Sequence, residues 1–471
     1  MFFAVNSISS PRLRVSARAP SLNYQFHISN YQFPSHPPPS IRTRYVSSPP
    51  PCKAPAKSRA GDFLRGIGPG IITGAADDDP SGIATYSSAG ALLGTSMLWT
   101  ALVTWPLMCA VQFMCARIGM VTGEGLGAVF NKKYPRWLVI AFSVGLLIAN
   151  SINIGADLSG MADAGQLLTR IPSLPLVFIF GAGIAAATIQ FRYSQIANTL
   201  KWLALSLFAY VIAAFVSHGD WTGVLHDSFI PSLPRNNAAW GMLVAILGTT
   251  ISPYLFYWQS SEEVEEEKAR GQLSLRSRRG ATPGEIGIRK LDVGIGTFFS
   301  NLVMYFIILT TALTLHRHGV TQVDTSKQAA EALGPLAGRL SALLYTVGLL
   351  GVGFLAIPTL SGSAAYALAE TFHWKEGLDR PLGRAPSFYA VIVLSTALGV
   401  ALNFAHVNPV RALYWSAVVN GLLAPFVMVA ILAVAADRKL MCNQPSSIPS
   451  RVIVAICTLL MFGAAVGMFI T

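Results

Sequence analysis

The stretch Asp77-Asp78-Asp79-Pro80-Ser81-Gly82 interrupts a segment that is otherwise apolar, from Phe63 to Gly94. A proline inside a helix removes a backbone donor and clashes with the preceding turn. Each ionised carboxylate at the middle of a bilayer costs about 2.5 to 3.5 kcal/mol on insertion scales. The sequence therefore predicts a break in this helix, with its acids facing a polar cavity.

The rest of the chain has the composition of a membrane protein, because 52% of its 471 residues are hydrophobic and only 12% are charged. A bilayer core of about 30 Å needs roughly 20 apolar residues per helix. Continuous apolar runs of this length favour helices over a transmembrane barrel, whose strands alternate. Eleven spans are predicted, at residues 63–94, 96–118, 137–158, 174–190, 194–216, 239–259, 291–315, 340–371, 388–404, 410–434 and 452–470.

The sixth span repeats the interruption of the first, with Gly248-Thr249-Thr250-Ile251-Ser252-Pro253-Tyr254 inside an apolar segment. Proline-broken helices at matching positions of two halves indicate an inverted-repeat transporter whose site lies at the bilayer midplane. Trp105-Pro106 and Ala424-Pro425 are interpreted as simple kinks. The predicted fold class is an all-α polytopic membrane protein.

The chain divides into a tail, residues 1–61, and a transmembrane domain, residues 62–471. The tail holds eight Lys or Arg and no Asp or Glu, which leaves +4 of the net charge of +12 for the rest. It is rich in Ser and Pro and is predicted to be disordered, either as an organelle transit peptide or as an untargeted extension. Nineteen Lys and Arg fall in the loops on the side of the amino terminus and six on the other, so that terminus is predicted to be cytoplasmic.

The two interrupted helices resemble those of the natural resistance-associated macrophage protein (Nramp) family of divalent metal transporters. That family breaks its first helix at Asp-Pro-Gly-Asn and its sixth at Met-Pro-His, within a LeuT-type five-plus-five inverted repeat that carries an eleventh helix. The resemblance implies that Asp79 is the carboxylate ligand. It also implies that Ala76 and Thr249 offer backbone carbonyls, and that Ser252 stands where the family has its methionine.

The departures from the family pattern bear on the choice of ion. Gly82 replaces the asparagine and Ser252 the thioether, which leaves hard oxygen ligands and more room. Such ligands suit Mg²⁺ or Mn²⁺, and Mg²⁺ usually keeps several waters when it binds. The pattern is closest to the Nramp-related magnesium transporter branch. We expect uptake of Mg²⁺ or Mn²⁺, with Fe²⁺ as a further option.

Three more polar residues are candidates for the same site. Asp78, with its neighbour Asp77, is expected either to attract cations or to accept hydrogen bonds from backbone donors freed by the break. Asn420 precedes Ala424-Pro425 by one turn and is a candidate metal ligand or a contact to a neighbouring helix. The predicted metal-site residues are therefore Asp79, Ala76, Thr249, Ser252, Asp78 and Asn420.

Proton coupling is predicted to be weak or absent. Tyr254 stands at the family's histidine, the side chain best suited to exchange protons near neutrality. Asp157-Leu158-Ser159-Gly160 resembles the family's Asp-x-x-Glu but places Gly160 at the glutamate. A dication entering a negative interior gains about 2.3 kcal/mol per charge per 100 mV, so uptake needs no proton.

An acidic run, Glu262 to Glu267, follows the sixth span. It is interpreted either as a metal-sensing patch or, preferably, as a solvated helix extension before a flexible cytoplasmic loop.

The remaining predictions concern class and partners. The alternatives are a proton-coupled Mn²⁺/Fe²⁺ symporter and a metal sensor with the same membrane domain. An organic-solute transporter is disfavoured because three acids repel anions, and no nucleophile–base set indicates an enzyme. The metal is expected as substrate with no cofactor, the partners are divalent ions and lipid but not nucleic acid, and the oligomeric state is open, with a monomer compatible. The plasma membrane is favoured, or an organelle membrane if the tail is a transit peptide.

Overall fold

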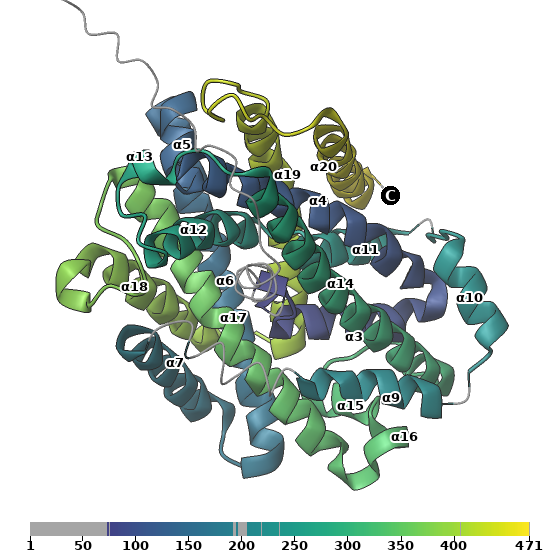
Figure 1. The fold of residues 1–471 in the computed structure, drawn as a ribbon. Coiled ribbons are helices and arrows are strands. Elements are labelled where there is room, and N and C mark those ends of the chain that lie inside the picture. The colour runs from purple at the N-terminus through teal and green to yellow at the C-terminus, as the bar shows by residue number, and fades with distance from the viewer. Residues whose placement is uncertain are drawn as a thin grey trace, which may run out of the picture. The chain divides into compact units, whose positions relative to one another are not determined.

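The computed structural model describes residues 73–74, 76–191, 195, 205–217, 219–234, 236–405 and 407–470, and the predicted tail at 1–61 lies outside these ranges. All regular structure within them is helical (Figure 1). The α-helices are α3 (Pro80–Leu93), α4 (Leu98–Thr122), α5 (Leu126–Lys133), α6 (Arg136–Thr169), α7 (Ser173–Gln190), α9 (Ala209–Val216), α10 (Trp221–Phe229), α11 (Asn237–Thr250), α12 (Pro253–Ala269), α13 (Leu275–Arg278), α14 (Pro283–Thr314), α15 (Ser326–Glu331), α16 (Gly334–Ala337), α17 (Ser341–Phe372), α18 (Pro386–Leu402), α19 (Pro409–Ala435) and α20 (Ile448–Ile470). The short 3₁₀ helices are η1 (Gly94–Met97), η2 (Leu205–Phe208), η3 (His316–His318), η4 (Gly338–Leu340), η5 (Leu382–Arg384) and η6 (Asn403–Ala405).

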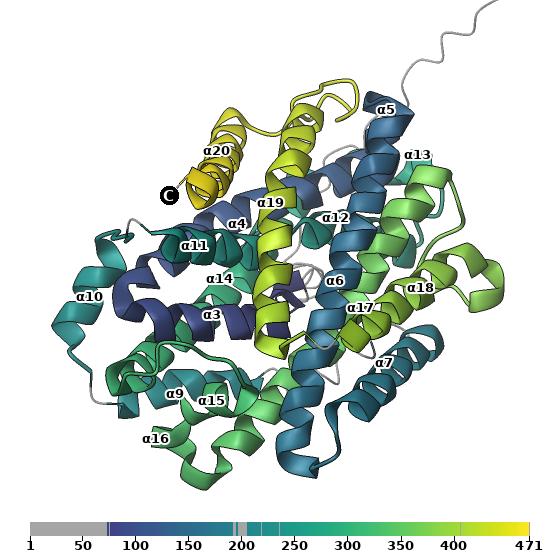
Figure 2. The same cartoon turned by 180° about the vertical axis from the view of Figure 1, so that it is seen from behind.

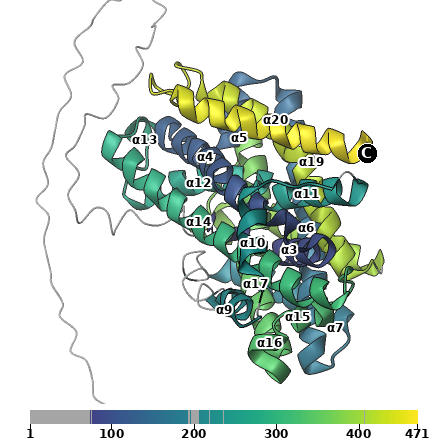
Figure 3. The same ribbon diagram turned by 90° about the vertical axis from the view of Figure 1, so that its right-hand side faces the viewer.

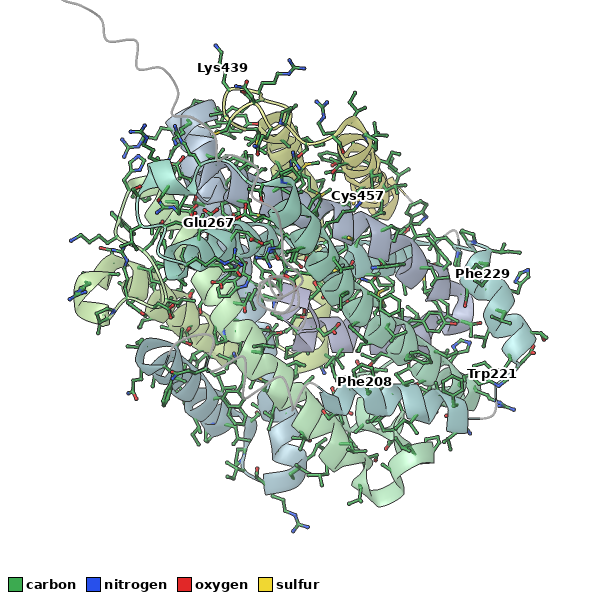
Figure 4. All side chains as sticks on the ribbon, viewed as in Figure 1. Phe208, Trp221, Phe229, Glu267, Lys439 and Cys457 are labelled. Carbon is green, nitrogen blue, oxygen red and sulfur yellow. The ribbon has the colours of Figure 1, made fainter. Side chains whose placement is uncertain are left out.

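The described ranges contain nine helical runs that are long and apolar enough to cross a membrane. One of them, Pro80–Thr122, joins α3 and α4. It contains the predicted second span and the part of the predicted first span that follows the break. The predicted span at 194–216 is described only in part, by η2 and α9. Figure 4 shows Trp221 and Phe229 at the periphery, on α10, and Phe229 is 73% exposed. Apolar side chains exposed in this way are expected of a bundle that lipid surrounds.

Both predicted helix breaks are confirmed. Asp79 has an extended backbone (φ −73°, ψ 169°), and α3 begins immediately after it at Pro80. Ser252 is extended as well (φ −83°, ψ 139°) and separates α11 from α12. The prolines interpreted as kinks behave differently, since Pro106 lies inside α4 and Pro425 inside α19. A proline alone therefore does not end a helix in this bundle.

The contacts between helices support two related halves, because a contact made by a helix of one half is matched by a contact of the equivalent helix of the other half. In the predicted repeat, α4 and α14 hold equivalent places, as do α6 and α17, and each equivalent pair packs together. The contact of α3 with α14 is matched by the contact of α12 with α4, and that of α9 with α14 by that of α19 with α4. Figure 2 shows α19 and α6 side by side across the face that Figure 1 hides.

Helices from the two predicted sides of the membrane lie at opposite ends of the bundle. In Figures 1, 2 and 3, α5 and α13 lie at one end and α15 and α16 at the other. The basic residues Lys132, Lys133, Arg276 and Arg278 lie on α5 and α13. The α5 end is therefore the end that the charge distribution predicts to be cytoplasmic.

The acidic run after the second break is helical, but two of its five glutamates are buried, so the interpretation as a solvated extension is wrong for them. α12 continues to Ala269, and Glu263 and Glu267 are buried. Figure 4 shows Glu267 at this end of α12. Burial is possible because Arg289, on α14, forms an ion pair of 2.8 Å with Glu263. The following loop holds the helix α13 and contacts α4, where Gly280 N donates to Val121 O.

Candidate metal-binding site

Asp79 combines two roles at the first break. Its Oδ1 accepts hydrogen bonds from Gly82 N at 2.6 Å and from Ser81 Oγ at 2.9 Å, so the carboxylate caps the amino terminus of α3. The positive end of the helix dipole stabilises a carboxylate at this position. Asp79 is only 2% exposed. The break therefore holds a buried negative charge in a fixed orientation.

The second oxygen of Asp79 belongs to an amide network that the sequence did not reveal. Asn153, on α6, donates through Nδ2 to Asp79 Oδ2 at 3.0 Å and to Asp157 Oδ2 at 2.9 Å. Its Oδ1 accepts from Asn420 Nδ2 at 3.0 Å. Asn153 and Asp157 lie one helical turn apart. The sequence pointed to Asp157 through its likeness to the family's Asp-x-x-Glu, and it gave no signal for Asn153. The network connects α3, α6 and α19 at the break.

Asn420 reaches the site because α11 and α19 approach each other closely. A Cβ atom on Gly248 would lie 2.0 Å from Ala417 O, and one on Gly421 would lie 2.5 Å from Val244 O. Only glycine permits this contact between backbones. Asn420 Nδ2 donates to Asn153 Oδ1, while Asn420 Oδ1 is buried without a hydrogen-bond partner. That oxygen is free to bind a cation.

The second break contributes neutral oxygens. Ser252 Oγ lies 2.5 Å from Gly248 O and 3.0 Å from Thr249 O, and its single hydrogen points toward these carbonyls, so its lone pairs point away from them. Tyr254 OH donates to Ala76 O at 3.2 Å and thereby connects the two breaks. A carbonyl oxygen has a second lone pair, which leaves Ala76 O able to accept once more.

Neighbouring side chains lie close to Gly82. A Cβ atom built on Gly82 would lie 3.1 Å from Thr249 Oγ1, 3.3 Å from Tyr86 Cε2 and 3.4 Å from Asp79 Oδ1. The Thr249 and Tyr86 side chains thus occupy the room beside Gly82. The larger room expected of the whole site stays a prediction.

Asp77 and Asp78 face α14. Ser300 Oγ lies 2.6 Å from Asp77 Oδ2 and 3.1 Å from Asp78 Oδ1. The structure places one shared hydroxyl donor between the two carboxylates, in place of the expected backbone donors. Asp78 is therefore separated from the Asp79 amide network, although both belong to the same break.

We call Asp77, Asp78, Asp79 and Asp157 the central aspartates. All four are buried, and within the described ranges none of them forms an ion pair with Lys, Arg or His. In the same ranges no three His, Cys, Asp or Glu side chains converge in the manner of a metal centre. A cation at this site would therefore be coordinated in part by carbonyl, hydroxyl and amide oxygens or by water, as is usual for Mg²⁺.

The fold and this site define the chain as a multi-pass membrane protein of the LeuT-type transporter class, with two broken helices around buried acids. The structure of a manganese transporter from Eremococcus coleocola superposes with a TM-score of 0.70 at 18% identity, covering 88% of each chain. MhsT in complex with L-phenylalanine superposes with a TM-score of 0.53 at 15% identity, covering 88% of this chain and all of that one. These likenesses concern the fold.

Sequence comparison identifies the family. The chain matches the family described as "Natural resistance-associated macrophage protein-like" over residues 70–471, and it belongs to that Nramp family. It is 26% identical over 391 residues to the divalent metal cation transporter MntH of Caldanaerobacter subterraneus subsp. tengcongensis, covering 80% of this chain and 86% of that protein. It is 25% identical to MntH of Yersinia enterocolitica, covering 86% and 93%.

Proposed function

We propose that this chain transports divalent cations across the membrane and binds them at the break before α3. The observation that carries the proposal is the set of central aspartates, which are buried without a basic partner in the described part of the chain. Buried charges are normally paired or bound to metal, because an uncompensated charge in the interior is costly. The relatives named divalent metal cation transporters support a dication as the cargo. This is transport without enzymatic turnover, and the metal is substrate and not cofactor.

The proposed ligands are the Asp79 carboxylate, the carbonyls of Ala76 and Thr249, Ser252 Oγ and Asn420 Oδ1. Support comes from the orientation of Ser252 and from the free oxygen of Asn420. Asn153 is proposed as a positioning residue, because it holds Asp79 and Asn420 in fixed orientations without offering an oxygen of its own.

The proposed cargo is Mg²⁺ or Mn²⁺ before Fe²⁺. All proposed ligands are hard oxygen donors, and such donors suit Mg²⁺ and Mn²⁺ better than they suit softer metal ions. A Ser252→Met variant tests the assignment, since a thioether favours transition metals. We expect its flux of Cd²⁺ to rise relative to that of Mg²⁺ by about tenfold, equivalent to about 1.4 kcal/mol. An unchanged Cd²⁺/Mg²⁺ ratio would remove Ser252 from the ligand set.

We further propose that uptake is weakly coupled to protons or not coupled. Tyr254 is engaged in a hydrogen bond to Ala76 O. At Gly160, a Cβ atom would lie 2.8 Å from Leu413 Cδ1, so an apolar side chain fills the space of an acid. α18 contains no arginine that could pair with α6. Acidification inside liposomes that tracks metal entry would instead establish a symporter.

The plasma membrane is the proposed location. The organelle alternative depended on residues 1–61, which lie outside the described ranges.

Flux into liposomes tests the proposed function most directly. Purified protein is reconstituted with a trapped dye, and the initial rates of Mg²⁺ and Mn²⁺ entry are compared for the unaltered chain and Asp79→Asn. Asparagine retains the capping oxygen for α3, so the fold should persist while the rate falls at least tenfold. Asp437→Asn, at an aspartate outside the spans, is the matched control and should transport normally. Equal rates for all three proteins would refute the assignment of Asp79.

A further inference from the structure

Asp77, Asp78 and Ser300 form a second group of oxygens, on the α14 side of the break. The backbone explains how they meet. A Cβ atom on Gly74 would lie 2.4 Å from Gly296 O, so the chain before the break contacts α14 backbone to backbone. Ser300 follows Gly296 by one turn and Asp78 follows Gly74 by four residues. The close contact therefore brings the hydroxyl and the two carboxylates to the same level.

The hydrogen bonds of this group do not balance. Ser300 has a single hydroxyl hydrogen, yet its oxygen lies within 2.6 Å of Asp77 Oδ2 and 3.1 Å of Asp78 Oδ1. Thr297 and Thr311, also on α14, donate to the carbonyls four residues earlier. Ser300 instead points at two acids and can serve only one of them at a time.

One further buried oxygen of these acids is left without a partner. Asp77 Oδ1 has no hydrogen bond and is shielded from solvent. The Tyr86 hydroxyl is buried beside its hydrogen-bonding neighbour Thr249, and it interacts electrostatically with Asp77, Asp78 and Asp79. Buried acceptors without donors are costly. A cation contacts several oxygens at once and needs no hydrogen, so it removes this imbalance.

We infer that Asp77, Asp78 and Ser300 form a second binding site for a hydrated divalent cation, distinct from the Asp79 site. The inference rests on the proposed function for the identity of the ion. Two dications would neutralise all four central aspartates, whereas one at Asp79 leaves half of their charge uncompensated. The second site stages an ion beside the Asp79 site, and Ser300 links it to α14.

Counting bound ions tests the inference. Mn²⁺ binding to the full chain in detergent is measured by equilibrium dialysis, with free Mn²⁺ followed by electron paramagnetic resonance. We expect two ions per chain for the unaltered protein. The Asp77→Asn/Asp78→Asn variant should bind one ion, at the Asp79 site, and Asp79→Asn should retain only the second. Ser300→Ala should weaken the second site by about tenfold.

Each result separates the inference from the proposed function. If the Asp77→Asn/Asp78→Asn variant binds as many ions with the same affinities, the second site does not exist. If the same variant loses every ion, the acids belong to a single site and the inference is overturned. If Asp79→Asn binds normally while the double variant loses an ion, the assignment of Asp79 fails and the second site survives.

Ser395→Ala is the control for Ser300→Ala. Ser395 is likewise a buried serine in a long helix, and its hydroxyl donates to a backbone carbonyl, that of Ile392. Its loss should leave both affinities unchanged. Equal weakening by the two serine variants would overturn the inference, because it would assign the effect to packing.

Discussion

Two groups of buried acids in this protein differ in their counter-ions. Near the α5 end, the Arg289 cluster joins Arg289, itself 3% exposed, to Glu263, Glu266 and Asp292. Nε lies 2.8 Å from Glu263 and a terminal nitrogen 2.5 Å from Asp292. The central aspartates instead receive hydrogen bonds from amides and hydroxyls. Acids with a permanent cation stabilise the fold, whereas acids without one are available to a mobile ion.

The largest expected effect is the loss of the permanent cation. Arg289→Met leaves Glu263 and Asp292 buried without their cation, and breaking a buried ion pair in this way costs about 3–5 kcal/mol. Thermal or denaturant unfolding in detergent measures the difference. Arg411→Met is the control, since Arg411 is 71% exposed and 3.8 Å from Asp324. We expect Arg411→Met to lower the free energy of unfolding by less than about 1 kcal/mol. Equal losses for the two variants would contradict the stabilising role of the Arg289 cluster.

Added metal should stabilise the protein through the central aspartates. A ligand at about 100 times its Kd stabilises the state that binds it by about 2.7 kcal/mol. We expect Mn²⁺ to raise the melting temperature of the unaltered chain but to have much less effect on Asp79→Asn. Arg289→Met, measured under conditions in which it folds, should still show the rise in melting temperature with Mn²⁺. If Arg289→Met lost the rise in melting temperature with Mn²⁺ while Asp79→Asn kept it, the roles assigned to the two groups of acids would be reversed.

Neutralising one acid should have opposite effects in the two groups. Asp157→Asn removes one of four neighbouring negative charges and keeps an oxygen for the hydrogen bond from Asn153. Without metal, we expect a gain of up to about 1 kcal/mol. Glu263→Gln should instead destabilise the chain, because it removes a partner of Arg289. Unfolding of both variants in the presence of a chelator measures whether each one gains or loses stability. Equal losses of stability would refute the predicted difference between the two groups of acids.

The smallest effect concerns an ion pair in which both groups contact water. Lys133 Nζ lies 2.7 Å from Asp437 Oδ2, and this hydrogen bond holds the pKa of Asp437 below its usual 3.8. The pair should contribute less than about 1 kcal/mol. A lowered carboxyl pKa stabilises the fold above the unfolded value, and the contribution disappears as the pH falls through the folded value. The stability difference between the unaltered chain and Asp437→Asn should therefore vanish well below pH 3.8.

Local chemistry explains why both breaks were predictable from sequence. Pro80 and Pro253 follow polar residues in apolar segments, and lipid tolerates an interrupted backbone only where protein or a cavity satisfies it. Pro106 and Pro425 lack such neighbours and remain inside α4 and α19. The number and order of the spans follow from the length of the apolar runs, because the thickness of the bilayer sets that length.

Tertiary structure alone decided which oxygens meet. Asn153 joins Asp79 to Asn420 although the three residues lie on different helices, and Ser300 reaches Asp77 only because Gly74 and Gly296 touch. The sequence predicts that the acidic run of α12 is solvated, whereas in the structure Arg289 of α14 pairs with Glu263 of this run. Sequence determined where the chain breaks and where its charges lie, since those depend on neighbours along the chain. Which charges are paired depends on contacts between distant segments, and only the packed bundle specifies those.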